Sequence, residues 1–144
     1  MRRRRPPQSL EDYGFERTNQ FHHFGAIVES PAAIYLGDWR VIVQCLLIFG
    51  QQQQAQLWIY EVVGIENDRA TRTKYSYHLT YDGSFVFRYD RDQQHPDMVE
   101  HKHLPPDERR VPWDAVTLQE VVDEVVAFTA EREAEAVERH DGEE

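Results

Sequence analysis

Four histidines lie within one short part of the chain and carry its most versatile chemistry. They are His78, His95, His101 and His103. Because imidazole titrates near neutral pH, two such side chains on either side of a phosphodiester can serve as base and acid. A neighbouring cation would stabilise the charge that develops in the transition state. This combination suits RNA cleavage through the 2′-hydroxyl, and His78, His101 and His103 are the candidate catalytic residues.

Basic side chains near these histidines are the candidates for holding a phosphate group. Within residues 69–91 five basic residues outnumber two acidic ones, although the whole chain has a net charge of −10. The acidic excess lies at the end of the chain, where residues 114–144 contain 11 acidic and 2 basic residues. The positive strip can therefore face phosphate. We expect substrate contacts from Lys74, Arg88, Lys102 and His95.

Metal binding and a purely structural role are the alternatives for these histidines. On an extended strand His101 and His103 point the same way, about 7 Å apart, and could share an ion with His78 or His95. His-x-His alone is a weak metal signal, and the chain has no helical His-Glu-x-x-His motif and only one cysteine. We therefore expect no metal and no cofactor. In the structural alternative the imidazoles are half-buried and bonded to backbone groups.

The clearest structural pattern lies in residues 74–90 and positions several of these groups. Aromatic residues alternate with polar ones on both sides of Asp82-Gly83, which predicts a β-hairpin. A two-residue loop would put the aromatic rows on opposite faces, so we predict a three-residue loop that pairs Tyr77 with Phe87. The polar face would then carry Lys74, Ser76, His78, Arg88 and Asp90.

Other segments predict further strands and one helix around this hairpin. Residues 39–65 contain two apolar strands, and a shorter strand before them is expected to end at Ser30-Pro31. Residues 99–104 form one more strand. Thr117 and Glu120 have the spacing of a capping box, and the apolar stripe that follows predicts a helix. The expected fold is α+β, with an antiparallel sheet of about five strands and a C-terminal helix on one face.

The domain organisation follows from the same patterns. We expect a single α+β domain over residues 21–130, because 144 residues suit one domain. Residues 1–20 lack apolar periodicity and are expected to form a disordered basic arm. Residues 131–144 are expected to form an acidic helical extension or a disordered tail. The longest apolar run, residues 41–49, is far shorter than the ~20 residues of a membrane-spanning helix, so we expect a cytoplasmic protein without a membrane partner.

The motifs between residues 69 and 130 follow one another in a characteristic order. They are Tyr75-Ser76-Tyr77-His78, Asp82-Gly83, Phe87-Arg88-Tyr89-Asp90, His95-Pro96, His101-Lys102-His103 and a helix led by Thr117. In this order they resemble the TumE-type toxin family of prokaryotic toxin–antitoxin modules. The resemblance implies a small cytoplasmic toxin that acts on RNA and is neutralised by a DNA-binding antitoxin. It supplies no established catalytic residues.

Two functional hypotheses therefore stand beside each other. In the first, the chain is a toxin that cleaves RNA by histidine acid/base catalysis without a metal, with its cognate antitoxin and RNA as partners. In the second, it is a non-catalytic interaction protein whose acidic C-terminal segment binds a basic partner surface. Glycine motifs of nucleotide-binding loops are absent from the sequence, which excludes nucleotide kinases and Rossmann dehydrogenases. The oligomeric state stays open, a homo-oligomer included.

Overall fold

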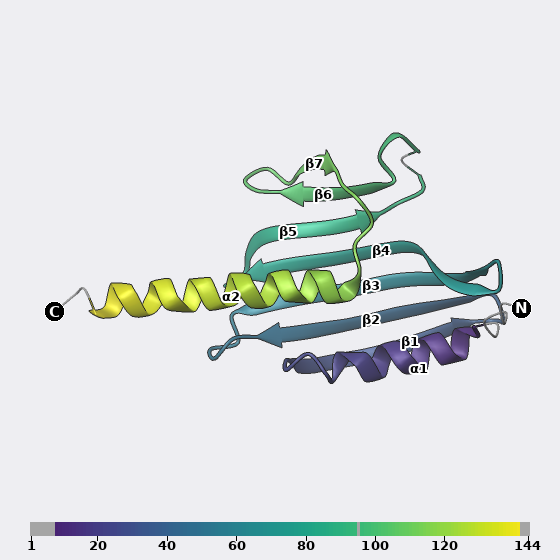
Figure 1. Cartoon of the computed structure of the whole chain (residues 1–144), viewed down its shortest axis with the longest axis horizontal. Coiled ribbons are helices and arrows are strands. Elements are labelled where there is room, and N and C mark those ends of the chain that lie inside the picture. The colour runs from purple at the N-terminus through teal and green to yellow at the C-terminus, as the bar shows by residue number, and fades with distance from the viewer. Residues whose placement is uncertain (1–7, 95, 142–144) are drawn as a thin grey trace, which may run out of the picture.

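An antiparallel seven-stranded sheet is the framework of the protein in the computed structural model, which describes residues 8–94 and 96–141. The strands lie in the sheet in the order in which they occur along the chain (Figure 1). They are β1 (Ile27–Leu36), β2 (Arg40–Phe49), β3 (Ala55–Glu66), β4 (Arg69–Tyr81), β5 (Ser84–Arg91), β6 (Glu100–Leu104) and β7 (Arg109–Pro112). A short 3-10 helix, η1 (Pro96–Met98), precedes β6. The α+β class is confirmed.

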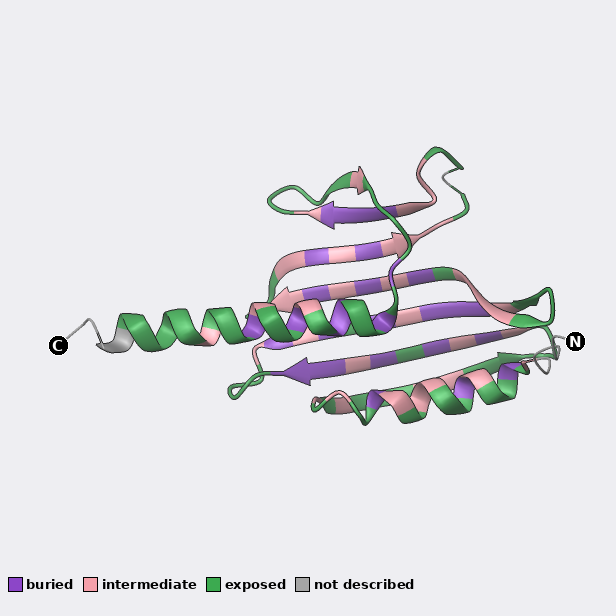
Figure 2. Cartoon of the chain, in the orientation of Figure 1, coloured by how far each residue is buried: buried purple, intermediate pink, exposed green. Residues whose placement is uncertain are grey.

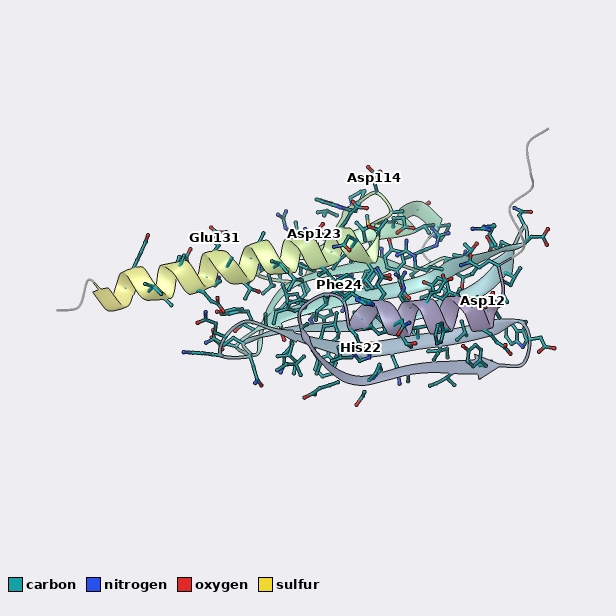
Figure 3. The ribbon with its side chains drawn as sticks, turned by 60° about the horizontal axis from the view of Figure 1, so that its bottom comes forward. Asp12, His22, Phe24, Asp114, Asp123 and Glu131 are labelled. Atoms are coloured by element: carbon teal, nitrogen blue, oxygen red, sulfur yellow. The ribbon has the colours of Figure 1, made fainter. Side chains whose placement is uncertain are left out.

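Two helices, α1 (Leu10–Phe21) and α2 (Leu118–Asp141), lie over the same face of this sheet (Figures 1 and 3). Alternate residues of β2, β3 and β4 point toward the helices and form one core with them. Tyr77, Leu57, Phe21 and Val125 are among its fully buried side chains. Each side chain of this kind contributes about 1.5–3 kcal/mol when it leaves water. We call this the covered face and the opposite side of the sheet the open face.

Helix α2 begins at the expected capping box. Thr117 Oγ1 accepts a hydrogen bond from the backbone N–H of Glu120, and Glu120 Oε1 accepts one from the N–H of Thr117, both at 3.1 Å. The stripe of Leu118, Val121 and Val125 is buried, which confirms the predicted packing. Beyond this stripe the helix continues past the end of the sheet and is exposed (Figure 2). Neither described helix combines the length and apolar character needed to cross a membrane.

Helix α1 corrects the expectation of a disordered arm for the residues that the structure describes before Phe21. Ser9 caps the helix by accepting from the N–H of Asp12 at 3.0 Å. Gly14 faces β1 so closely that a Cβ there would collide with the hydroxyl of Tyr35. These tertiary contacts hold a helix whose own sequence has only a weak apolar stripe, which explains why periodicity missed it. The expected arm also includes residues 1–7, which lie outside the described residues.

The β4–β5 hairpin is confirmed, but its predicted register is wrong. The loop is the two-residue Asp82-Gly83 turn, and Tyr77 pairs with Tyr89 rather than with Phe87. A β-bulge in β5 at Val86 inserts one residue and restores the parity that a two-residue loop would otherwise break. Phe87 and Tyr89 therefore still share the covered face with Tyr75 and Tyr77, whereas Phe85, before the bulge, lies opposite Thr80 and packs against His78 on the open face. Ser76 faces Asp90 across the strands instead of Arg88.

The sheet has seven strands instead of the expected five or so, and two of the strands differ from the sequence prediction. Strand β1 does not end at Ser30-Pro31, because a bulge between Glu29 and Ala32 accommodates this pair and lets the strand continue to Leu36. Proline is tolerated there since β1 is an edge strand and one side of its backbone needs no partner. Strand β7 is only four residues long, too short for a residue pattern to indicate it.

Candidate functional site

The open face gathers most of the predicted site residues on three neighbouring strands. His78 of β4 pairs with Arg88 of β5, and Arg88 pairs in turn with His103 of β6. Two pairs further along, Asp90 of β5 lies opposite His101 of β6. Because side chains alternate along a strand, all five point to the side of the sheet that α1 and α2 leave uncovered. The predicted common direction of His101 and His103 is confirmed.

Asp90 is the centre of a compact polar cluster on this face. Its Oδ2 atom accepts a hydrogen bond from Arg88 Nε at 3.0 Å. The same oxygen lies 3.1 Å from His103 Nε2 and 3.4 Å from His101 Nε2. Arg88 Nη2 is also 2.9 Å from His103 Nε2. The other carboxylate oxygen, Oδ1, is buried and has no hydrogen-bond partner among the described residues. A carboxylate so placed has capacity for a further donor or cation.

Backbone carbonyls fix the orientation of both imidazoles in this cluster. His101 Nδ1 lies 3.0 Å from the carbonyl oxygen of Met98, and His103 Nδ1 lies 2.8 Å from that of Glu108. A carbonyl oxygen only accepts, so each Nδ1 carries the hydrogen. Each Nε2 is therefore the nitrogen that faces Asp90. The side chains of His101 and His103 are 3% and 9% exposed, so surrounding loops nearly enclose them.

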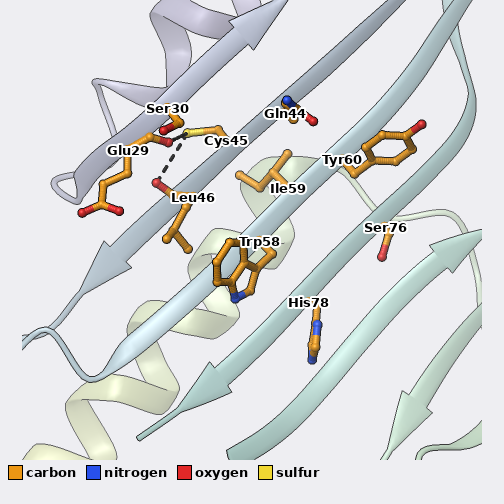
Figure 4. Close-up of a pocket in the computed structure, with 10 residues that line it drawn as sticks. All are labelled: Glu29, Ser30, Gln44, Cys45, Leu46, Trp58, Ile59, Tyr60, Ser76 and His78. Carbon is orange, nitrogen blue, oxygen red and sulfur yellow. Dashed lines mark hydrogen bonds between the residues drawn. The ribbon is translucent and has the colours of Figure 1, made fainter. Parts of the chain in front are cut away.

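His78 stands beside a pocket on the open face. Its ring packs against Phe85 with 5.5 Å between centroids, and its Nε2 atom is buried without a hydrogen-bond partner in the described part of the chain. Burial, reinforced by the positive charge of Arg88, lowers the pKa of His78 below its usual value of 6.5. The pocket has a volume of ≈ 510 Å³. Figure 4 shows its lining side chains, among them Glu29, Gln44, Trp58, Tyr60, Ser76 and His78.

A comparison with family models identifies the family to which the chain belongs. The model described as Toxin TumE matches residues 34–133, more than half of the chain. The chain belongs to the TumE toxin family. It is thus the toxin component of a toxin–antitoxin module, and such a toxin has a cognate antitoxin as its partner. Comparisons with curated proteins and with solved structures give no match.

The TumE match runs from the end of β1 through β7 to Glu133 of α2, and it leaves out α1 and Glu29 of the pocket. It also extends well beyond the residues 69–130 on which the sequence resemblance rested. The polar cluster of Arg88, Asp90, His101 and His103 lies entirely within the matched range, as does His78.

Lys102 is the one described candidate that the structure takes away from the cluster. It points to the covered face, where Nζ donates to Glu124 of α2 at 2.9 Å. The ammonium group also lies over the rings of Tyr89 and Trp113, at 4.5 and 4.8 Å from their centroids. Its expected role in holding phosphate beside the histidines is therefore not supported by its position. Lys102 instead ties β6 to helix α2.

The other two predicted substrate contacts are Lys74 and His95. Lys74 is exposed on β4, four residues before His78. Successive even-numbered residues of β4 share the open face, so Lys74 borders it without a described contact to the histidines. His95 falls outside the described residues. Of the seven predicted site residues, the structure brings together four: His78, Arg88, His101 and His103.

A second polar network was missed by the sequence reasoning. Glu61 of β3 is fully buried beneath α1, where Arg17 donates to both of its carboxylate oxygens at 3.0 Å. The hydroxyls of Tyr13 and Tyr77 donate to the same carboxylate. Burial, together with the charge of Glu61, raises the pKa of Tyr77 well above its usual value, so this hydroxyl keeps its proton. One signal was available: Glu61 interrupts an otherwise apolar strand at a position that faces the core.

Proposed function

We propose that this toxin cleaves RNA on the open face, by acid/base catalysis that needs no metal. The observation that supports the proposal is the joint placement of Arg88, Asp90 and His103 in direct contact, next to a pocket that His78 lines. A phosphate-binding cation and two imidazoles on one accessible face are the groups that phosphodiester cleavage needs. We place this activity in the cytoplasm, where RNA is present.

The proposed reaction uses the 2′-hydroxyl of the RNA as the nucleophile. His78 Nε2, which is buried and has no hydrogen-bond partner among the described residues, accepts the proton of that hydroxyl while its oxygen attacks phosphorus. The bond from phosphorus to the 5′ oxygen breaks, and His103 in its charged form gives a proton to this leaving oxygen. The products are a 2′,3′-cyclic phosphate and a 5′-hydroxyl. Arg88 stabilises the negative charge on the phosphoryl oxygens.

Asp90 and His101 support these groups rather than touch the substrate. Asp90 accepts a hydrogen bond from Arg88 and lies beside both imidazoles, so it holds the cation and the imidazoles in place. His101 is almost completely enclosed, which makes it a positioning residue for Asp90. The sequence predicted that all three histidines act on the substrate directly, whereas we now propose this role for His78 and His103 alone.

Exposed aromatic rings beside His78 provide a surface for unpaired bases. The side chain of Trp58 is cross-strand from His78 and is 48% exposed, and Tyr60 follows it on the same face. Stacking of RNA bases on such rings is a general mode of single-strand recognition and contributes about 1–3 kcal/mol per base. Lys74, which is exposed on the same face, is placed to meet the backbone of a longer strand.

RNA cleavage in the presence of a chelator is the direct test of this proposal. Purified toxin is incubated with total cellular RNA in EDTA, and the fragments are analysed for their end groups. We expect fragments with 2′,3′-cyclic phosphate and 5′-hydroxyl ends. Intact RNA, together with harmless overexpression of the toxin in a host without antitoxin, would refute the proposal.

The alternative function, a non-catalytic interaction protein, is favoured by the protruding end of α2. The last turns of this helix extend past the sheet and carry acidic residues (Figure 1). Deleting residues 135–144 tests it and keeps Glu133, whose Oε1 accepts from the N–H of Gln51 at 2.8 Å. We expect the truncated toxin to retain its RNA cleavage rate within about twofold, because the open face is unchanged. Loss of antitoxin binding with no cleavage by either form would favour the alternative.

A further inference from the structure

We propose that Asp90, His101 and His103 form a binding site for a divalent transition metal ion such as zinc. Among the described residues, these three form the one group of histidine, cysteine and carboxylate side chains whose ligand atoms all lie close together, within 4.8 Å of one another. They come from two neighbouring strands of a rigid sheet, so their spacing does not depend on a mobile loop. The proposal revises the expectation that the chain binds no metal.

Two of the distances within the group match the edges of a zinc coordination tetrahedron. Zinc binds imidazole nitrogen and carboxylate oxygen at about 2.0–2.2 Å, which places neighbouring tetrahedral ligands about 3.4 Å apart. Asp90 Oδ2 lies 3.4 Å from His101 Nε2 and 3.1 Å from His103 Nε2. An ion can therefore enter between them with small adjustments. Two imidazoles and one carboxylate leave a fourth position for water, as in catalytic zinc sites.

The hydrogen-bond pattern around the imidazoles is the one that metal-binding histidines need. Each Nδ1–H is directed to a backbone carbonyl, of Met98 for His101 and of Glu108 for His103. With Nδ1–H held in this way, Nε2 is the nitrogen left to bind an ion, and the hydrogen bond makes the ring a better ligand. Imidazole ligands favour zinc, nickel and copper over magnesium and calcium, which prefer oxygen.

Arg88 occupies the space that the ion would take and supplies the positive charge in the metal-free protein. Its guanidinium donates to Asp90 Oδ2 at 3.0 Å and lies 2.9 Å from His103 Nε2. The side chain of Arg88 is 32% exposed, so it can swing outward when an ion arrives. The ion and Arg88 then compete for the same two atoms. Metal affinity is accordingly set by the guanidinium as well as by the ligands.

This competition makes the ion an inhibitor of the proposed cleavage. Zinc bound to His103 Nε2 takes the lone pair that has to carry the proton, and it displaces the cation that holds phosphate. Inhibition rests on the proposed function, whereas metal binding does not. A toxin of this kind would be held inactive by a transition metal and released by its removal.

Metal binding is measured first on the untagged full-length protein. Titration with Co²⁺, followed by its visible absorption, and with Zn²⁺, followed by calorimetry, should give one equivalent bound with a rise in the thermal midpoint. The matched control is the double variant His22→Ala/His23→Ala, which removes two adjacent exposed imidazoles. This control should bind the metal as tightly as the original chain.

Substitutions in the site distinguish the metal ligands from Arg88, which competes with the ion. His101→Ala and Asp90→Asn should each weaken zinc binding about 100-fold or more, since each removes a ligand. Arg88→Gln should strengthen binding, because it removes a competing positive charge. Weaker zinc binding in Arg88→Gln would overturn the assignment. The assignment would also be overturned if the His22→Ala/His23→Ala variant bound one equivalent of zinc less than the original chain. The absence of a Co²⁺ spectrum in the original chain would also overturn the assignment, and this result does not depend on whether any variant folds.

The RNA assay then distinguishes failure of the metal site from failure of the proposed function. If the toxin cleaves RNA in chelator, one equivalent of zinc should stop cleavage and EDTA should restore it. Cleavage that continues with zinc bound would overturn the inhibitory role alone. Stoichiometric metal binding without any RNA cleavage would leave the site in place and refute the proposed function.

Discussion

Replacing His78 by alanine is expected to lower the rate of RNA cleavage about 10²-fold or more while the protein stays folded. His78 lines the pocket, and its buried Nε2 atom has no hydrogen-bond partner among the described residues, so a 2′-hydroxyl that enters the pocket would find a proton acceptor there. His103→Ala should have an effect of similar size, since it removes the proton donor. The double variant should be little slower than the worse single one, because acid and base act in one step.

The control for this prediction is His23→Ala, which removes an exposed imidazole remote from the open face. It should cleave RNA at the original rate. Circular dichroism and thermal melts establish that each variant is folded. If His78→Ala and His103→Ala are both folded and both fully toxic, the catalytic assignment has to be abandoned.

The pH dependence of cleavage provides a second readout of His78. Arg88 and His103 disfavour its charged form and Asp90 and Glu108 favour it, and with burial the net result is a pKa below 6.5. His78 is therefore neutral, and able to act as a base, at pH 7. As the pH falls through this lowered pKa the base gains a proton, and the rate should decline only below pH 6.5. The variant His78→Ala should lose this acidic limb.

The residue pattern predicted which side chains share the open face but not how they meet. Alternation placed Arg88 and Asp90 on one side of β5, because the period of a strand is two. The predicted three-residue loop put His78 on that same side, and the observed two-residue turn with its bulge has the same parity. The register itself depended on the bulge at Val86, which no local preference announces. The contact between Asp90 and His101 required the order of β5 and β6, and a polar loop with no pairing signal joins them. Side-chain direction was therefore predictable, whereas partners across strands were not.

Helix α1 shows the opposite limit of sequence reasoning. Its pattern of apolar residues is sparse, and most of its stabilisation comes from contacts with strands far along the chain. The main one joins Arg17 to Glu61, which are 44 residues apart in the sequence. The sequence around Arg17 does not indicate that its partner is an acid on a distant strand. Only the buried acid in β3 indicates that a cation has to come from elsewhere.

Arg17→Met is expected to destabilise the protein by about 3–5 kcal/mol, because it leaves a fully buried carboxylate without its cation. The hydroxyls of Tyr13 and Tyr77 would still donate to Glu61, but two neutral donors do not replace a charge. Chemical denaturation measures the loss, and the double variant Arg17→Met/Glu61→Gln should recover most of it.

Arg132→Met is the matched control, since this helical arginine meets Glu135 at 3.8 Å with both side chains about half exposed. It should change stability by no more than about 0.5 kcal/mol. The contrast between the two arginines isolates burial as the cause, because both sit on a helix near an acid. A loss below about 1 kcal/mol for Arg17→Met would mean that α1 can leave the sheet at little cost and that water then reaches Glu61. The helix that precedes the family core would in that case be a loosely held cover rather than a part of the fold.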